Sequence, residues 1–381
     1  MNAPAHPSVS QPAQHPADAG FMAEAIALGV AGLGLAAPNP SVGAVVVKDG
    51  VVIGRGATRA GGRPHAETEA LRDAGDAARG ATLYVSLEPC SHHGVTPPCA
   101  DAIVRAGVAR VVSALDDPDT RVSGRGHKRL RDAGVEVLVG VGAREARRAN
   151  LGHILRITEG RPMVTLKLAE TADGFAAGST HDQRLMITGI EANNRVQKMR
   201  AQHDAIMVGI GTALADDPLL TVRSSGLEHH RPLRVVLDTH LRLRKRSRIA
   251  ATAHERKTLI LCGADAPAER QILLESVGID IVRVPLDQDG HVDLRQALHV
   301  LAKRGVTRVF SEGGPTIARR LVDLGLADEV VVFTSPKPLG REGVLSLDRD
   351  TRDALGDAMR FDVIEDGRVG VDRLRIYERR P

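Results

Sequence analysis

The sequence is poor in aromatic residues and has no tryptophan. Aromatic side chains make up 2% of its 381 residues, five Phe and two Tyr, whereas hydrophobic residues make up 43%. The cores must therefore be built from Ala, Val, Leu and Ile. Proteins that hold single-stranded nucleic acid usually stack the bases on aromatic side chains. The composition therefore argues against a nucleic-acid partner.

Cysteines and long apolar runs are also scarce. Three cysteines in a chain of this length cannot form a disulfide framework, and Cys90 and Cys99 lie close together beside a histidine motif, which indicates metal binding in a reducing compartment. No stretch approaches the roughly 18 apolar residues that span a bilayer. Residues 1–18 have no apolar signal core, and we expect a disordered tail there. The sequence predicts a cytoplasmic protein with no membrane partner.

Charge of either sign is nearly balanced. Lys and Arg number 51 and Asp and Glu 47, a surplus of four. We expect this surplus to be spread along the chain without a basic block. It predicts a weak preference for anionic ligands such as phosphate esters, and not a nucleic-acid footprint.

The first part of the chain has the pattern of a three-layer α/β domain. An apolar helical segment over residues 21–36 stops at Pro38, and two β-branched runs then flank Asp49-Gly50, a two-residue hairpin signal. Helix and strand patterns alternate after the hairpin. The predicted elements are helices 65–74, 98–106 and 126–133 and strands 42–48, 51–55, 81–87, 110–115 and 135–140.

A second alternating series follows a charged helical connector over residues 143–157. It starts at Gly160-Arg161-Pro162, and neither series repeats the other. Since 381 residues exceed what one core usually supports, we predict two domains, over residues 19–158 and 159–381. The predicted strands of the second are 163–169, 205–209, 233–238, 257–262, 279–284, 308–310 and 329–334.

His65, Cys90 and Cys99 form a candidate zinc site. One imidazole and two thiolates leave a fourth position of a tetrahedral zinc for water, whose pKa the metal lowers toward neutrality. Residues i and i+2 of a helix point roughly 200° apart, so Glu67 should not share a metal with His65. Glu67 is therefore predicted to take a proton from the attacking water and pass it to leaving ammonia.

The context of these residues makes the signal specific. Pro64 and Pro98 place His65 and Cys99 near helix N-termini, whose dipoles favour thiolates at Cys99 and Cys90. An isolated His-x-Glu carries little information, and small free cysteines are most often inert core residues. The order His-x-Glu, then a strand ending in Pro-Cys, then a second Cys matches the zinc nucleobase deaminase signature.

One departure from that signature concerns the cysteine spacing. The general pattern ends Pro-Cys-x-x-Cys, whereas residues 91–98 separate Cys90 from Cys99. The polar side chains of this insert are predicted to lie beside the zinc and to contact substrate. A structural zinc would need a fourth protein ligand, which His92 or His93 offers.

The second half carries a weaker signal of its own. It lacks the Gly-x-Gly-x-x-Gly of a Rossmann dinucleotide site. Residues 310–316 and 209–212 instead run from a strand through glycines into a helix, where backbone amides receive a phosphate as often as they serve structure. Cys262 is predicted to be a buried structural thiol, and His229-His230 to be solvated.

Taken together, the motifs closely resemble the bifunctional riboflavin biosynthesis deaminase/reductase family over nearly the whole chain after the tail. The strings similar to its deaminase are Pro38-Asn39-Pro40, His65-Ala66-Glu67, residues 88–94 and Thr96-Pro97-Pro98-Cys99. Those similar to its reductase are residues 166–169, 173–174, 187–189, 216–218, 220–223 and 312–315.

The resemblance implies a cytidine-deaminase-like fold for the first domain and a dihydrofolate-reductase-like α/β fold for the second. It also implies two consecutive reactions. A diaminopyrimidinone carrying a phosphoribosylamino group loses its 2-amino group to water with the help of zinc, and NADPH then reduces the ribosyl group of the product to ribityl. A homodimer is implied as well.

Individual site residues are implied by position in the family's motifs. The pyrimidine contacts would be Asn39, Ala66 and His92. The reductase substrate contacts would be Arg184, Arg200, Leu220, Arg223 and Glu312. The NADPH contacts would be Ala169, Met186, Thr212, Asp216, Thr239 and Gly314, with Lys167 near the chemistry. Val95 stands where the family usually has Lys or Arg, which leaves the phosphate contact of this domain open, with His93 and Arg63 as candidates, and Met186 replaces a frequent Trp.

Two other classes of function stay open at the level of sequence. One is a zinc deaminase acting on another base or on nucleic acid, with a remodelled C-terminal half. The other is a non-catalytic binding protein stabilised by zinc, in which Glu67 is incidental.

Overall fold

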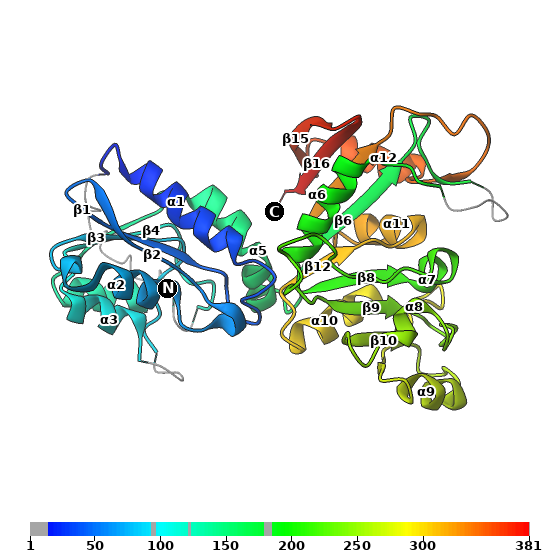
Figure 1. Ribbon diagram of the computed structural model, residues 1–381, viewed down its shortest axis with the longest axis horizontal. Helices are drawn as coiled ribbons and strands as arrows, with labels where there is room; N and C mark the ends of the chain where they lie inside the picture. The colour runs from blue at the N-terminus through cyan, green and yellow to red at the C-terminus, as the bar shows by residue number, and fades with distance from the viewer. Residues whose placement is uncertain (1–13, 93–96, 121–122, 179–184, 381) are drawn as a thin grey trace, which may run out of the picture. The chain divides into compact units, whose positions relative to one another are not determined.

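The computed structural model describes residues 14–92, 97–120, 123–178 and 185–380. The chain forms two compact units, Met1–Thr158 and Glu159–Pro381, each described by itself (Figure 1). Most of the predicted N-terminal tail lies outside the described residues. Within the described part, no helix has the length and apolar character needed to cross a membrane.

The first unit is built on a five-stranded sheet with the order β2-β1-β3-β4-β5. β1 pairs antiparallel with β2 and β3, and β3, β4 and β5 run parallel. The strands are β1 (Gly43–Lys48), β2 (Val51–Ala57), β3 (Thr82–Val85), β4 (Arg110–Ser113) and β5 (Glu136–Val139). The helices are α1 (Asp18–Ala31), α2 (Ala66–Ala74), α3 (Cys99–Ala106), α4 (Arg125–Asp132) and α5 (Ala143–Thr158), with short 3-10 turns at Ala60–Gly62 and Gly75–Ala78.

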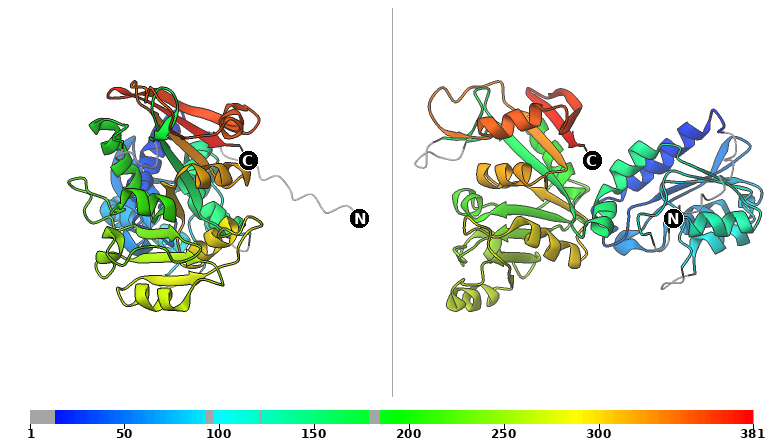
Figure 2. Two further views of the ribbon diagram at one scale, coloured as in Figure 1. Left: turned by 90° about the vertical axis from the view of Figure 1, so that its right-hand side faces the viewer. Right: turned by 180° about the vertical axis from the view of Figure 1, so that it is seen from behind.

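Helices cover both faces of this sheet, which gives the predicted three layers. α1 and α5 lie side by side on one face, where Met22 and Ala146 pack against Val45 (Figures 1 and 2). α2, α3 and α4 contribute to the core on the other face, which includes Ala70, Ile103 and Leu130. The sheet therefore separates two apolar cores, both poor in aromatic side chains.

The first helix starts earlier and ends earlier than its apolar pattern predicts. Asp18, its first residue, is fully buried and accepts hydrogen bonds from both terminal nitrogens of Arg110, at 2.8 and 2.9 Å, and from the Tyr84 hydroxyl at 2.8 Å. Burial alone would raise the pKa of Asp18, but these donors hold it at about 2. The helix ends before Gly34, whose φ of 77° is incompatible with a right-handed helix. A buried ion pair thus fixes α1 to the sheet.

The second unit contains a nine-stranded sheet with the order β11-β10-β9-β8-β12-β6-β13-β16-β15. The first seven strands of this order are parallel, and β16 and β15 add an antiparallel hairpin. The strands are β6 (Met163–Glu170), β8 (Ala205–Gly209), β9 (Leu233–Leu237), β10 (Thr258–Cys262), β11 (Asp280–Arg283), β12 (Arg308–Ser311), β13 (Glu329–Thr334), β15 (Phe361–Val369) and β16 (Asp372–Arg379). β7 (Phe175–Ala177) and β14 (Val344–Leu345) pair separately.

Helices cover both faces of this sheet as well (Figure 1). One face packs against α10, α11 and α12, and the other against α6, α7, α8 and α9. Their bounds are α6 (Ile190–Ala201), α7 (Ile210–Asp216), α8 (Arg248–Ala251), α9 (Ala268–Glu275), α10 (Leu294–Lys303), α11 (Pro315–Asp323) and α12 (Arg349–Gly356). β12 lies between β8 and β6 in the sheet. The chain adds β8 to β11 on one side of β12 and β13 on the other side. Ligands of open α/β sheets bind at the carboxyl ends of the strands, where the order of the strands reverses in this way.

Candidate functional site

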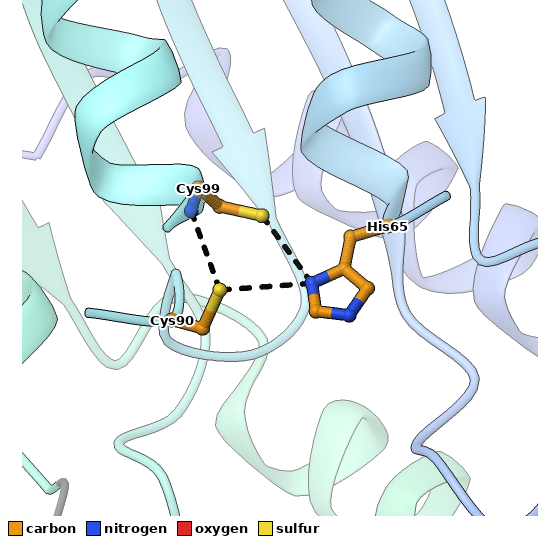
Figure 3. Close-up of side chains that lie close together, drawn as sticks. All are labelled: His65, Cys90 and Cys99. Carbon is orange, nitrogen blue, oxygen red and sulfur yellow. Dashed lines mark hydrogen bonds between the residues drawn. The ribbon is translucent and has the colours of Figure 1, made fainter. Parts of the chain in front are cut away.

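Three side chains predicted to hold a metal meet at one point of the first unit. His65 caps the start of α2, Cys99 begins α3, and Cys90 follows β3. His65 Nδ1 lies 3.3 Å from Cys99 Sγ and 3.7 Å from Cys90 Sγ, and the three atoms lie within 4.8 Å of one another (Figure 3). One imidazole nitrogen and two sulfurs are donors that zinc prefers. The residues present therefore fit a zinc ion with three protein ligands.

The two cysteines differ in their electrostatics. The backbone N–H of Cys99 donates to Cys90 Sγ at 3.3 Å. Donation from Cys99 and the neighbouring His65 lower the pKa of Cys90 to about 4, whereas the contact with Cys90 and burial raise the pKa of Cys99. The first N–H of α3 thus points at the sulfur of Cys90 and not at that of Cys99. The expected thiolate at Cys99 stays a prediction for the zinc-bound site.

Glu67 lies beside these ligands but is not one of them. It is the second residue of α2, and its side chain is 4% exposed. Burial, together with the negative charge on Cys90, raises the pKa of Glu67 to about 7. A carboxyl group with such a pKa can both accept and return a proton near neutral pH.

Glu88 holds the segment that follows β4 against the zinc ligands. Its buried carboxylate accepts hydrogen bonds from four backbone N–H groups, those of Asp117, Gly124, Gly126 and His127, at 2.8 to 3.3 Å. A Cβ on Gly126 would lie 2.0 Å from the carbonyl oxygen of Pro89. The sequence identifies Glu88 only as part of a motif, because its hydrogen-bond partners lie 29 to 39 residues away and no pattern near Glu88 indicates them.

The predicted pyrimidine contacts surround this site only in part. Asn39 Nδ2 donates to the carbonyl of Gly62 at 3.3 Å, which places Asn39 beside the segment leading to His65. Ala66 is fully buried, so only its backbone can reach a ligand. His92 is exposed. His93 and Val95 lie outside the described residues.

In the second unit, several predicted cofactor contacts gather at the carboxyl ends of the parallel strands. Gly209 and Gly314 cap the starts of α7 and α11. A Cβ on Gly314 would lie 3.3 Å from Thr212 Oγ1, and Thr239 follows the neighbouring strand β9. The start of α11 at Gly314, with the start of α7 beside it, fits the phosphates of a dinucleotide, whereas Gly209 itself packs against Ile317.

Two predicted substrate contacts are paired with each other. Arg200 donates to both carboxylate oxygens of Glu312, at 2.6 and 2.9 Å, and also to the carbonyl of Thr221 at 3.0 Å. Although burial opposes the charge, Glu312 raises the pKa of Arg200. Leu220 is buried with a φ of 51°, and Arg223 is exposed. The Arg200–Glu312 pair is therefore joined to the loop that contains Leu220 and Arg223.

The other residues predicted for the reductase site are located only by their element and their exposure. Lys167 and Ala169 alternate along β6 and are half-buried, just past the point where Leu166 pairs with Ser311 of β12. Asp216 ends α7. Met186 is 77% exposed in the coil before α6. Arg184 lies outside the described residues.

Three smaller expectations have mixed outcomes. Cys262 is fully buried, as predicted. His230 is buried and stacks on His229 with ring centroids 4.3 Å apart, so the prediction that both are solvated is wrong. The expected even spread of positive charge is also wrong, because five exposed basic side chains follow β9: Arg242, Arg244, Lys245, Arg246 and Arg248.

Comparison with family models matches both parts of the chain. Residues 16–115 match the model described as the cytidine and deoxycytidylate deaminase zinc-binding region. Residues 162–362 match the model described as the RibD C-terminal domain. The zinc ligands His65, Cys90 and Cys99 fall within the first match.

Full-length relatives and solved structures agree with these models. The chain is 39% identical to riboflavin biosynthesis protein RibD of Escherichia coli (strain K12) over 363 residues, which cover 92% of this chain and 96% of the relative. It is 34% identical to Acinetobacter baumannii RibD, form 1, with a TM-score of 0.83 and coverage of 96% and 99%. A Thermotoga maritima diaminohydroxyphosphoribosylaminopyrimidine deaminase/5-amino-6-(5-phosphoribosylamino)uracil reductase gives a TM-score of 0.80 at 34% identity, with coverage of 95% and 99%.

Proposed function

This chain belongs to the RibD family of bifunctional deaminase/reductases of riboflavin biosynthesis, and on that premise we propose which of its residues carry each reaction. It has a zinc-binding deaminase domain followed by an NADPH-dependent reductase domain, so the predicted fold class and pair of activities are confirmed. The observation that carries the residue assignment is the meeting of His65, Cys90 and Cys99 beside a buried Glu67.

The deaminase step uses Glu67 as the proton carrier. His65, Cys90 and Cys99 would hold a zinc ion, which would supply the Lewis acidity for attack of water on a ring carbon near neutral pH. Glu67, with a pKa of about 7, accepts a proton of the attacking water and returns it to the leaving amino group, which departs as ammonia. Asn39, the backbone of Ala66 and His92 hold the edge of the pyrimidine.

The reductase step takes place at the carboxyl edge of the second sheet. NADPH supplies the hydride that converts the ribosyl side chain to ribityl. Thr212, Thr239 and the backbone at Gly314 bind the cofactor, and Lys167 lies nearest the reacting sugar. Ala169, Asp216 and Met186 complete the proposed cofactor contacts.

Charged side chains fix the phosphorylated substrate of the reductase. Arg184 and Arg223 suit a sugar phosphate because their planar guanidinium groups bind it through two hydrogen bonds. Arg200 is already paired with Glu312, so these two act together. The side chain of Leu220 is buried, so only its backbone is available beside them.

The test is an assay that follows the two products separately. Zinc-loaded protein is given the phosphoribosylated diaminopyrimidinone and NADPH, and ammonia release and NADPH oxidation are recorded. Ammonia release followed by NADPH oxidation is expected. Glu67→Gln should reduce ammonia release by about 10³-fold with unchanged zinc content, since only proton transfer is removed. Ammonia release by Glu67→Gln at the wild-type rate would overturn the assigned mechanism.

Domain limits, assembly and location belong to the same proposal. We place the deaminase domain at residues 19–158 and the reductase domain at 159–381, in a cytoplasmic homodimer. The free thiols of Cys90, Cys99 and Cys262 suit a reducing compartment. Sedimentation equilibrium tests the dimer, and NADPH oxidation by a fragment beginning at residue 159 tests the boundary.

A further inference from the structure

Arg234 is a buried arginine with an unusual set of partners. It lies in β9, between β8 and β10, and its side chain is 0% exposed. Its acceptors among the described residues are two threonine hydroxyls and three backbone carbonyls, and none is a carboxylate. Burial, with a smaller effect of Arg256, lowers the pKa of Arg234 to about 10, so the group stays charged at neutral pH.

A buried charge without a counter-ion is costly, and it persists only where many hydrogen bonds compensate it. Here one guanidinium joins β9, which carries it, to two other parts of the chain. It bonds Thr258 Oγ1 at 2.6 and 3.0 Å, Thr252 Oγ1 at 2.7 Å, Arg256 O at 2.9 Å, Ile249 O at 3.0 Å and Leu219 O at 3.3 Å. The first four acceptors belong to α8, the turn after it and β10, whereas Leu219 belongs to a distant loop.

That loop, residues 219–223, is fixed by side chains and not by regular structure. Its residues belong to no helix or strand. Arg234 binds the carbonyl of Leu219, Arg200 binds the carbonyl of Thr221, and Gln197 accepts the N–H of Arg223 at 2.8 Å. Every second residue of the loop is thus held by a side chain from outside it.

The residues between these three fixed points are directed into the core. Leu220 is 2% exposed and Val222 is 6% exposed. Leu220 also has a φ of 51°, a left-handed conformation that costs about 1 kcal/mol or more for a residue other than glycine. Such a backbone persists only when its surroundings hold it, and the Leu219 carbonyl that Arg234 binds is part of the peptide group joined to Leu220.

We propose that Arg234 is a positioning residue of the reductase, whose hydrogen bond to Leu219 holds residues 219–223 in the shape that presents the backbone at Leu220 and the side chain of Arg223 to the sugar phosphate substrate. This inference rests on the proposed function of the loop. Arg234 itself touches neither substrate nor cofactor. A purely structural role, in joining α8 to β10, is the alternative that the experiment must separate.

The experiment compares Arg234→Lys and Arg234→Met with a matched control, Thr252→Val. The control removes the acceptor on the α8 side that shares the Arg234 Nη1 nitrogen with Leu219, and it changes neither Arg234 nor the loop itself. We expect Arg234→Met to raise the reductase KM for the phosphoribosylaminouracil about tenfold, with a smaller change in kcat. Arg234→Lys should recover part of this loss, and Thr252→Val should leave KM unchanged. Thermal unfolding of the same samples reports whether the reductase unit stays folded.

Hydrogen exchange gives a readout that does not depend on activity. In Arg234→Lys, amides of residues 219–223 should exchange faster than in the wild type, and in Thr252→Val they should not. Unchanged exchange in this loop, or an equal rise in KM in the control, overturns the proposal. Arg223→Ala tests the substrate role of the loop separately from the role of Arg234. If Arg223→Ala leaves KM unchanged, the proposed substrate role of residues 219–223 is wrong, even if Arg234 holds the shape of the loop.

Discussion

The candidate sites of the two units are made of different kinds of groups. In the deaminase, a few reactive side chains lie at the starts of α2 and α3 and just after β3, all within two short motifs. In the reductase, the proposed contacts come from seven separate segments of the chain, and one of them is the backbone at Gly314, where α11 begins. A compact set of side chains can be found from spacing, whereas a dispersed surface requires the fold.

Their buried charges differ in the same way. Burial leaves Glu67 with a pKa of about 7, so this carboxyl can change its protonation during turnover. Glu312 is instead paired with Arg200, and this contact raises the pKa of Arg200. On the proposed roles, the deaminase uses a buried carboxyl to transfer a proton, and the reductase uses the Arg200–Glu312 pair to fix a loop.

The largest expected effect is loss of the deaminase activity with no loss of the reductase activity. Cys90→Ala removes a zinc ligand and the sulfur that accepts the N–H of Cys99, so zinc content and ammonia release should both be lost, the latter by at least about 10³-fold. NADPH oxidation with the deaminated substrate should be unchanged. Metal analysis and the two assays measure this.

The matched control for this prediction is Cys262→Ala, since Cys262 is a buried thiol of the other unit. It should retain zinc and ammonia release. Loss of NADPH oxidation in Cys90→Ala would show that the two activities are not separable in this chain.

The second effect concerns the reductase pair. Glu312→Gln leaves the buried guanidinium of Arg200 without its counter-ion, and kcat/KM of the reductase should fall about 100-fold, equivalent to about 3 kcal/mol. Ammonia release should not change. The control is Glu365→Gln, which removes an exposed pair with Arg195 and should leave kcat/KM of the reductase nearly unchanged, because surface pairs contribute little. Equal effects of the two variants would contradict this account of the pair.

The same comparison explains how far sequence reasoning reaches. The zinc ligands, Glu67 and both helix starts follow from residue types and spacing. Glu88 and Arg234 do not, because their hydrogen-bond partners are separated from them in sequence and carry no pattern of their own. The β15–β16 hairpin is also not predicted, since charged side chains such as Asp366 and Arg373 on its exposed positions obscure an apolar alternation.

The third effect is on stability and belongs to the deaminase unit. Asp18→Asn removes the buried carboxylate that pairs with Arg110, leaves the exposed Glu136 as a partner, and should lower the free energy of unfolding by about 3 kcal/mol. Asp132→Asn, which removes an exposed pair with Lys128, should cost less than 1 kcal/mol by the same measure. Chemical denaturation of the two variants measures the difference.

This ion pair also predicts a pH dependence. The pKa of Asp18 falls from 3.8 to about 2 on folding, so its stabilisation is fully present above about pH 4 and is lost as the pH falls through 2. The loss should amount to about 2 kcal/mol and should be absent in Asp18→Asn. An identical acid midpoint for the wild type and this variant would contradict it.

The smallest effect compares two helical glycines of the deaminase unit. Gly126 packs against the carbonyl of Pro89, and a Cβ there would lie 2.0 Å from that oxygen, whereas Gly20 in α1 has open space. Gly126→Ala must push α4 away from the Pro89-Cys90 segment and should cost about 1 to 3 kcal/mol of stability, with weaker zinc binding. Gly20→Ala should instead stabilise by about 0.5 kcal/mol, because alanine favours the helix and meets no neighbour. Thermal unfolding and competition for zinc with a chelator measure both, and a neutral Gly126→Ala would mean that α4 does not support the position of Cys90.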